Sequence, residues 1–208
     1  MDRRHRCNAE ATVVGYIWDS ADSPNHFAGF FYHNGKFDNY NVPGLPTGSD
    51  TVTYGINDFG AFCGFYGVPP DYDYVPFVNF AGHIDTNFNI PGAPTIPGTP
   101  AIYPLEVNNL GQVAGSWYES NDKGGLGLEH GFVRQPNGKI IEIDVPGAGS
   151  LGTQVQGVNN FGWVSGHFWK GPNNYEHALV LSPQGVLYQI DVPGAATTLA
   201  GGGTGGGA

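Results

Sequence analysis

Short stretches of alternating apolar and polar residues follow one another along this chain, and the last fifty residues show the pattern most clearly. Residues 153–158 alternate β-branched and polar side chains, and residues 163–169 are mainly aromatic and β-branched. Residues 177–181 and 186–192 are two further apolar runs, separated by a Ser-Pro-Gln-Gly turn. Such runs, bounded by turn residues, are typical of β-strands. The pattern predicts four short strands, the last of which ends at Pro193 because proline cannot donate to a β-ladder.

The same arrangement occurs four times. An Asn-x-x-Gly turn begins at Asn57, Asn108 and Asn159, and a degenerate copy begins at Asn8. A second glycine follows each clear turn (Gly64, Gly115, Gly166). A Pro-Gly marker closes each copy, at residues 41–44, 89–92, 144–147 and 191–194. The turns stand about 50 residues apart, and a fixed period of this length indicates a propeller, a solenoid or another repeat array.

Four consecutive four-stranded units cannot each bury both faces alone, so they are expected to stack. The sequence therefore predicts one all-β domain over residues 7–200, a small β-propeller built from four repeats. The repeats are expected at about 7–51, 52–101, 102–152 and 153–200, followed by a glycine-rich tail at 201–208. A five-bladed ring, an open stack of sheets and a propeller completed by a homodimer are the alternatives. No segment shows a sustained helical period, so almost no helix is expected.

The composition narrows the possible partners. The chain has 208 residues, of which 12% are charged, and its net charge is −10. Its only basic cluster is Arg3, Arg4 and Arg6, which predicts no nucleic-acid binding and favours cations or neutral ligands. No apolar run approaches the ~18 residues of a membrane span, and none follows the basic start as in a signal peptide. Cys7 and Cys63 occupy non-equivalent repeat positions, and either a disulfide between adjacent units or two free thiols fits the sequence.

The repeat resembles that of the bacterial extracellular HAF family. The shared residues are Gly-Ile-Asn at 55–57, Gly-Val-Asn at 157–159, His-Gly-Phe at 130–132, His-Ala-Leu at 177–179 and the Asp-Val-Pro-Gly-Ala endings at 144–148 and 191–195. The match covers about nine tenths of the chain, and it departs where residues 75–77 and 28–30 replace the histidine motif. The resemblance implies a β-propeller-like fold and an extracellular or periplasmic protein. It implies little about activity, because the family is defined by its repeat.

The repeated asparagines are the candidate metal ligands. If the first strand of each unit is innermost, Asn8, Asn57, Asn108 and Asn159 lie at one level around a central channel, and Asp58 adds a carboxylate. Oxygen donors of this kind suit Ca²⁺. The alternative is that each asparagine caps its own β-turn and recurs because the turn recurs.

Candidate catalytic residues are fewer. Glu129-His130 and Glu176-His177 open the third strand of the last two units, and His167 lies on an aromatic strand. Histidine is a general base near neutral pH, but neighbours in a strand point to opposite faces, so neither pair forms a dyad by itself. The alternative is a histidine that defines the repeat and hydrogen-bonds the backbone. Loops between the second and third strands carry a set of acidic residues expected at one rim: Asp19, Asp22, Asp71, Asp73, Glu119 and Asp122.

Two functions follow from these residues. The first is a calcium-dependent hydrolase of small esters or lactones, such as acyl lactones, in which the ion polarises a carbonyl. This hypothesis rests on analogy between propeller folds. The second is a non-catalytic exported module that binds a glycan or a protein. The sequence carries no nucleophile-elbow, zinc-protease or phosphate-loop motif.

Overall fold

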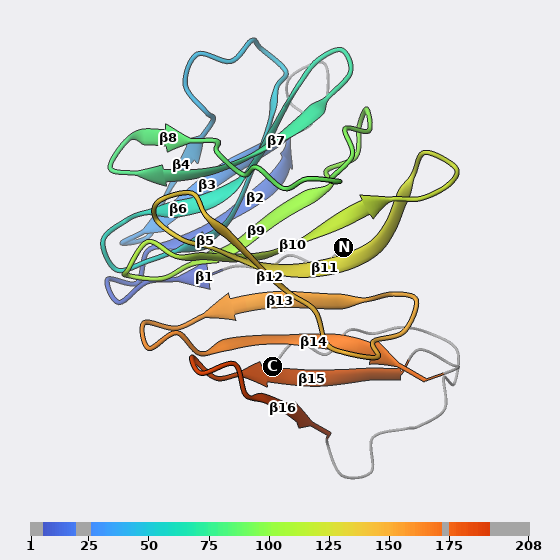
Figure 1. Ribbon diagram of the computed structural model, residues 1–208. Coiled ribbons are helices and arrows are strands. Elements are labelled where there is room, and N and C mark those ends of the chain that lie inside the picture. Colours follow the sequence, from blue (N-terminus) through green and yellow to red (C-terminus); the bar gives the residue numbers. More distant parts are fainter. Residues whose placement is uncertain (1–5, 20–25, 172–174, 192–208) are drawn as a thin grey trace.

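The structure is a computed structural model that describes residues 6–19, 26–171 and 175–191 (Figure 1). These residues form sixteen β-strands and no helix. Within the described ranges there is accordingly no helix that could cross a membrane. The predicted glycine-rich tail at 201–208 lies outside the described residues.

The strands form four separate sheets, each an antiparallel meander of four strands in chain order. Sheet 1 contains β1 (Arg6–Cys7), β2 (Val13–Asp19), β3 (His26–His33) and β4 (Lys36–Tyr40). Sheet 2 contains β5 (Asp50–Ile56), β6 (Phe62–Val68), β7 (Asp73–Phe80) and β8 (His83–Asp85). Sheet 3 contains β9 (Ile102–Val107), β10 (Val113–Ser120), β11 (Leu126–Arg134) and β12 (Ile140–Ile143). Sheet 4 contains β13 (Thr153–Val158), β14 (Val164–Lys170), β15 (Tyr175–Leu181) and β16 (Leu187–Ile190). The prediction of an all-β chain of four-stranded units is confirmed.

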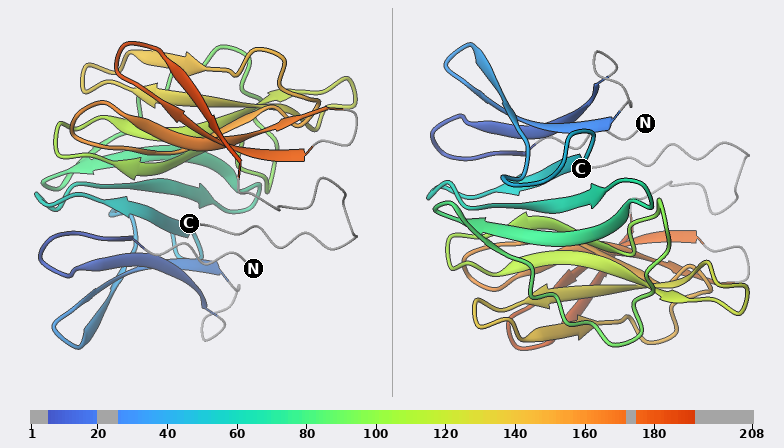
Figure 2. Two further views of the ribbon diagram at one scale, coloured as in Figure 1. Left: turned by 90° about the horizontal axis from the view of Figure 1, so that it is seen from below. Right: turned by 90° about the horizontal axis from the view of Figure 1, so that it is seen from above.

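The sheets stack face to face in chain order. The first strand of each later sheet packs against the second and third strands of the sheet before it, and successive first strands lie near one another. Sheets 1 and 4 lie at opposite ends of the stack in both views of Figure 2. The described residues thus form an open stack, one of the alternatives that the sequence left open.

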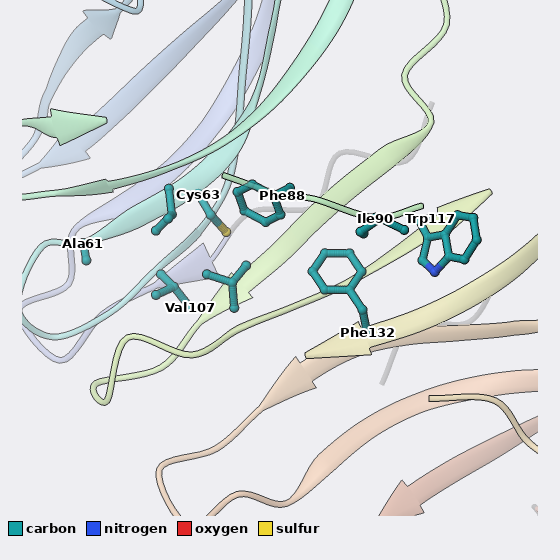
Figure 3. Packing of buried hydrophobic residues seen from close by; sticks show 9 residues of the cluster. Ala61, Cys63, Phe88, Ile90, Val107, Trp117 and Phe132 are labelled. Atoms are coloured by element: carbon teal, nitrogen blue, oxygen red, sulfur yellow. The ribbon is translucent and has the colours of Figure 1, made fainter. Parts of the chain in front are cut away.

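The hydrophobic core is divided among the interfaces between sheets. The largest cluster lies between sheets 2 and 3 and contains Cys63, Val78, Val107 and Phe132 together with residues of the segment after β8 (Figure 3). Trp117 is also part of this cluster and is only 5% exposed. A sheet buried on both faces needs apolar residues on both, which explains why the middle strands read as nearly continuous apolar runs.

The second glycine of the last three repeats is required by a bulge in the first strand. The pairing of β9 with β10 shifts register next to Gly115, and the equivalent shifts occur in sheets 2 and 4. A Cβ atom at Gly115 would lie 2.1 Å from the carbonyl oxygen of Tyr103, and Gly64 and Gly166 are equally confined by a carbonyl oxygen. The glycine recurs because two backbones approach too closely there for any side chain.

We expect Gly115→Ala to lower the free energy of unfolding by about 1–3 kcal/mol, the usual cost of forcing an extra methyl group into a packed interior. Denaturant titration measures the change. Gly124→Ala is not a neutral control, because Gly124 has a positive φ of 77°. Gly125→Ala is the better comparison, because Gly125 has no positive φ and a Cβ atom there would meet only the end of the flexible Asn121 side chain. An alanine at 115 that leaves the midpoint unchanged would contradict the close approach.

The two cysteines are both free thiols. Cys63 is fully buried in the cluster between sheets 2 and 3, whereas Cys7 is exposed. Burial raises the pKa of the Cys63 thiol to about 12, so it stays protonated and inert near neutral pH. Of the two interpretations of the sequence, the structure has the unpaired one.

Candidate functional site

The repeated asparagines hold the turns that follow the first strands. The side-chain oxygen of Asn57 accepts the backbone N–H groups of Phe59 at 3.0 Å and Ala61 at 2.9 Å. The same pair of bonds forms at Asn8, Asn108 and Asn159. Each asparagine therefore closes its own turn, as the short polar side chain of Asn does in an Asx turn.

The same side chains also join each repeat to the next. The amide nitrogen of Asn57 donates to the carbonyl oxygen of Asn108 at 2.9 Å, and that of Asn108 donates to the carbonyl oxygen of Asn159 at 3.0 Å. Asn8 donates to Asn57 in the same way at 3.2 Å. These four residues are called the asparagine ladder below. It fixes the height at which neighbouring sheets stack.

A second row of bonds runs beside the asparagine ladder. The backbone N–H of Ala9 donates to Asp58 at 2.7 Å, that of Asp58 to Asn109 at 2.9 Å, and that of Asn109 to Asn160 at 2.8 Å. The hydrogen bond from the Asn109 side chain, followed by that from Ala9, lowers the pKa of Asp58. The one carboxylate of the predicted metal set thus lies within the same turn network.

This geometry supports the turn interpretation of the asparagines. Each side-chain oxygen of the asparagine ladder already accepts two backbone N–H groups, and three of the four backbone carbonyls accept a neighbouring amide. A cation bound there would have to displace these donors. The structure therefore provides no preformed ring of open oxygen atoms at this level.

A polar cleft lies instead where the first strands of sheets 2, 3 and 4 (β5, β9 and β13) come near the β10 and β11 strands of sheet 3. It encloses about 220 Å³ and is lined by Tyr54, Tyr103, Leu105, Ser116, Tyr118, Glu129 and Gln154. We call it the tyrosine cleft. Tyr103 lies edge-on to Tyr118, with ring centroids 6.0 Å apart, and both rings are half-buried. The cleft therefore combines aromatic faces with a carboxylate, an amide and a hydroxyl.

A buried acid anchors the polar side of the tyrosine cleft. Glu129 is 3% exposed, and its side-chain oxygen accepts a hydrogen bond from Gln154 at 2.7 Å. Gln156 donates in turn to Gln154 at 2.8 Å and lies 3.1 Å from His167. Burial, then the charge of Glu129, raises the pKa of Tyr103 to about 12, so the phenol stays neutral near pH 7. The polar groups are thus held in place before any ligand arrives.

The other predicted catalytic residues do not line the tyrosine cleft. His130 stacks on Trp117 and pairs with Asp144, and His177 stacks on Phe168 and lies 2.6 Å from Asp191. The nearest ion pair of exposed Glu176 is with His167, at 3.8 Å. Glu129 and His130 point to opposite faces, as strand geometry requires.

The acidic loops do not gather into one described site. Of the rim residues, Asp22 lies outside the described residues, whereas Asp71, Asp73 and Asp122 are exposed. Glu119 differs, because its carboxylate lies 3.8 Å from the Nε2 atom of His130.

Sequence reasoning missed both the tyrosine cleft and one half-buried acid, Glu106. The three tyrosines occupy different positions in their repeats, so no periodic signal marks them. Glu106 stands where two other repeats have Gly55 and Gly157, and burial raises its pKa against the opposing effect of Arg6. A carboxylate in place of a repeated glycine was a signal that the sequence did carry.

Comparison with known proteins gives no match. No family model matches the chain, and no curated protein or solved structure matches it significantly.

Proposed function

We propose that this protein is a carbohydrate-binding repeat module whose ligand lies in the tyrosine cleft. The observation that carries the proposal is the gathering of Tyr54, Tyr103 and Tyr118 around one cavity with Glu129 and Gln154. A sugar ring has an apolar C–H face, which packs on aromatic rings, and hydroxyl groups, which pair with carboxylates and amides. Aromatic walls with a few fixed polar groups are the usual make-up of a ligand site.

The size and charge of the cleft agree with a neutral sugar. Its volume of about 220 Å³ is below the ~300 Å³ of most drug-sized sites, which suits one sugar unit of a longer chain. In the described part of the cleft Glu129 is the only charged lining residue, and it already accepts a hydrogen bond from Gln154.

We place the open stack as an arc of a β-propeller. The meander of each sheet and the packing of each first strand on the sheet before it are what a propeller blade requires. In that arrangement the first strand of each sheet lies nearest the axis, and Tyr54 and Tyr103 of the tyrosine cleft are on first strands. The resemblance to the extracellular HAF repeats would place such a module outside the cytoplasm, where glycans are abundant.

A calcium-dependent hydrolase of small esters or lactones is the competing hypothesis. It needs an activated water or a nucleophile beside the substrate. Glu129 lines the tyrosine cleft, whereas His130 and His177 lie on other faces. We favour binding because the cleft holds a fixed acid and amide without a paired histidine among its described lining residues.

Electrophoresis in gels that contain soluble glucans, xylans, mannans or chitosan derivatives tests the proposal. We expect one polysaccharide to retard the protein, and Tyr103→Ala to weaken binding about 30-fold, since removing a central aromatic contact commonly costs about 2 kcal/mol. Tyr188→Ala is the matched control, because Tyr188 is 48% exposed on β16 and outside the cleft. Retardation by none of the panel, or equal loss in both variants, would contradict the proposal.

The same preparations distinguish the competing hypothesis. Turnover of acyl lactones or short esters that EDTA abolishes and Ca²⁺ restores would establish the hydrolase. We expect none above the buffer rate.

A further inference from the structure

Sheets 3 and 4 each contain a histidine–aspartate pair at the same repeat position. The Nδ1 atom of His130 lies 3.0 and 3.1 Å from the two carboxylate oxygens of Asp144, and the Nδ1 atom of His177 lies 2.6 Å from Asp191. Each histidine also stacks on a ring of the neighbouring strand, His130 on Trp117 with centroids 4.5 Å apart. The pair is thus one repeated element, present in two copies whose surroundings can be compared position by position.

The surroundings of the two copies differ in charge. In sheet 4, Gln189 completes the pair: its amide donates to Asp191 at 2.7 Å and lies 3.1 Å from His177. The strand registers place Glu142 of sheet 3 at the position of Gln189, because Gly131 pairs with Ile143 as Ala178 pairs with Ile190. A carboxylate has replaced the amide.

A second difference between the two sheets also adds negative charge beside His130. Trp117 pairs with His130, and Phe168 pairs with His177. Counting two residues on from each ring, Glu119 of sheet 3, which lies at a bulge, corresponds to Lys170 of sheet 4. Lys170 is close enough to Asp191 to help lower its pKa, after the larger effects of His177 and Gln189. His130 is therefore surrounded by the carboxylates Glu119, Glu142 and Asp144 where its counterpart has one acid, one amide and one lysine.

Two buried polar atoms beside this cluster have no hydrogen-bond partner among the described residues. The first is the indole nitrogen of Trp117, which is 95% buried and lies near Glu142. Among the described residues, the buried Nε2 atom of His130 has no hydrogen-bond partner either.

We propose that His130, Glu142 and Asp144 form a binding site for a divalent transition-metal ion, with Zn²⁺ as the representative ion. One ligand atom from each residue lies within 4.8 Å of the others. A zinc ion with bonds of about 2.0–2.2 Å needs its ligands closer together, and the two exposed carboxylates can make that movement. Imidazole nitrogen with carboxylate oxygens suits Zn²⁺ better than Ca²⁺, which takes oxygen ligands only.

The surrounding groups fit this assignment. If Nδ1 of His130 binds the metal, its proton resides on Nε2, which faces Glu119 at 3.8 Å. A ligating histidine commonly donates its other N–H to a carboxylate in this way. Three protein ligands leave a fourth position for water or for a group of a bound partner.

Zinc titration of the untagged, EDTA-treated full chain against a chromogenic chelator tests the site. We expect one Zn²⁺ to bind, and Glu142→Gln, which restores the amide of sheet 4, to weaken it at least tenfold. Glu176→Gln is the control, because it makes the same chemical change on an exposed strand residue of sheet 4. Both substitutions preserve side-chain volume, so folding is retained.

A second measurement locates the ion. Paramagnetic Co²⁺ or Mn²⁺ should broaden the ring-proton NMR signals of His130 at concentrations that leave those of His177 sharp. No zinc binding by the wild-type chain, equal binding by Glu142→Gln, or broadening confined to another histidine would each overturn the proposal.

Discussion

Replacing Arg134 with alanine is expected to lower the free energy of unfolding by about 3 kcal/mol. Arg134 is fully buried, forms an ion pair with Asp85, and donates through Nε to the carbonyl oxygen of Asn87 at 2.8 Å. Its guanidinium group also lies over the ring of Phe88, 5.0 Å from the centroid. Removing one partner of a buried pair costs about 3–5 kcal/mol, and the lower value applies because the Asp85 side chain is 28% exposed.

The loss of stability is expected to be large because Arg134 joins two different sheets. Asp85 ends β8, the outer strand of sheet 2, whereas Arg134 ends β11 of sheet 3. The arginine therefore links sheets 2 and 3 through contacts that do not involve the asparagine ladder. Denaturant titration measures the loss, with Arg6→Ala as control: the Arg6 side chain is 42% exposed and lies 3.8 Å from Glu106, and such a pair contributes less than about 1 kcal/mol. Equal stability of the two variants would contradict this account.

Asn108→Ala is expected to cost a similar amount, about 3 kcal/mol. Asn108 is 5% exposed, and its side-chain oxygen accepts the N–H groups of Leu110 and Gln112. Its amide donates to the carbonyl of Asn159. Leaving a buried polar group unpaired costs about 1–3 kcal/mol, and alanine leaves several groups of the turn unpaired at once.

Two further variants separate the two roles of the side chain. Asn108→Asp keeps the accepting oxygen but loses the amide that joins the repeats, so its loss should be intermediate. Asn159→Ala removes the same turn bonds at an exposed end of the asparagine ladder, where water can replace them, and should cost about 1 kcal/mol. Thermal unfolding of Asn108→Ala, Asn108→Asp and Asn159→Ala measures the order of their losses of stability.

The asparagine variants also test the calcium hypothesis. If the turns alone explain these residues, adding Ca²⁺ to the EDTA-treated chain does not change the melting temperature. A calcium-dependent rise in the melting temperature that disappears in Asn57→Ala would support the hypothesis that the asparagines form a ring of oxygen ligands.

The repeated features of this chain were predictable because each answers a local requirement. The second glycine marks a close approach of backbones, because a Cβ atom at Gly115 would lie 2.1 Å from the carbonyl oxygen of Tyr103. The Asn-x-x-Gly sequence marks a turn. Strand alternation marked the four units for the same reason. Requirements of this kind act within a few residues, and a single sequence displays them directly.

The candidate site could not be predicted because it depends on contacts between repeats. Tyr54, Tyr103 and Tyr118 come from three strands and from different repeat positions, and only the stacking of sheets 2 and 3 brings them together. The sequence predicted the histidines as candidates because His130 and His177 recur at the same repeat position. Their pairing with Asp144 and Asp191 arises from the register of β11 with β12 and of β15 with β16.

Departures from the repeat are more informative about function than the repeat itself. Gln189 satisfies its histidine–aspartate pair, whereas Glu142 at the matching position adds a charge. Glu106 likewise replaces a glycine that two other repeats retain. Residues that a repeat needs for stacking recur, and residues that a ligand needs appear once.

Amide NMR titration of the wild-type chain with the oligosaccharide corresponding to the retained polysaccharide tests the central claim most directly. We expect the largest chemical-shift changes at Tyr54, Tyr103, Tyr118 and Gln154, with β16 unaffected. Changes confined to the acidic loops, or absent throughout at millimolar sugar, would contradict the claim that the tyrosine cleft is a carbohydrate site.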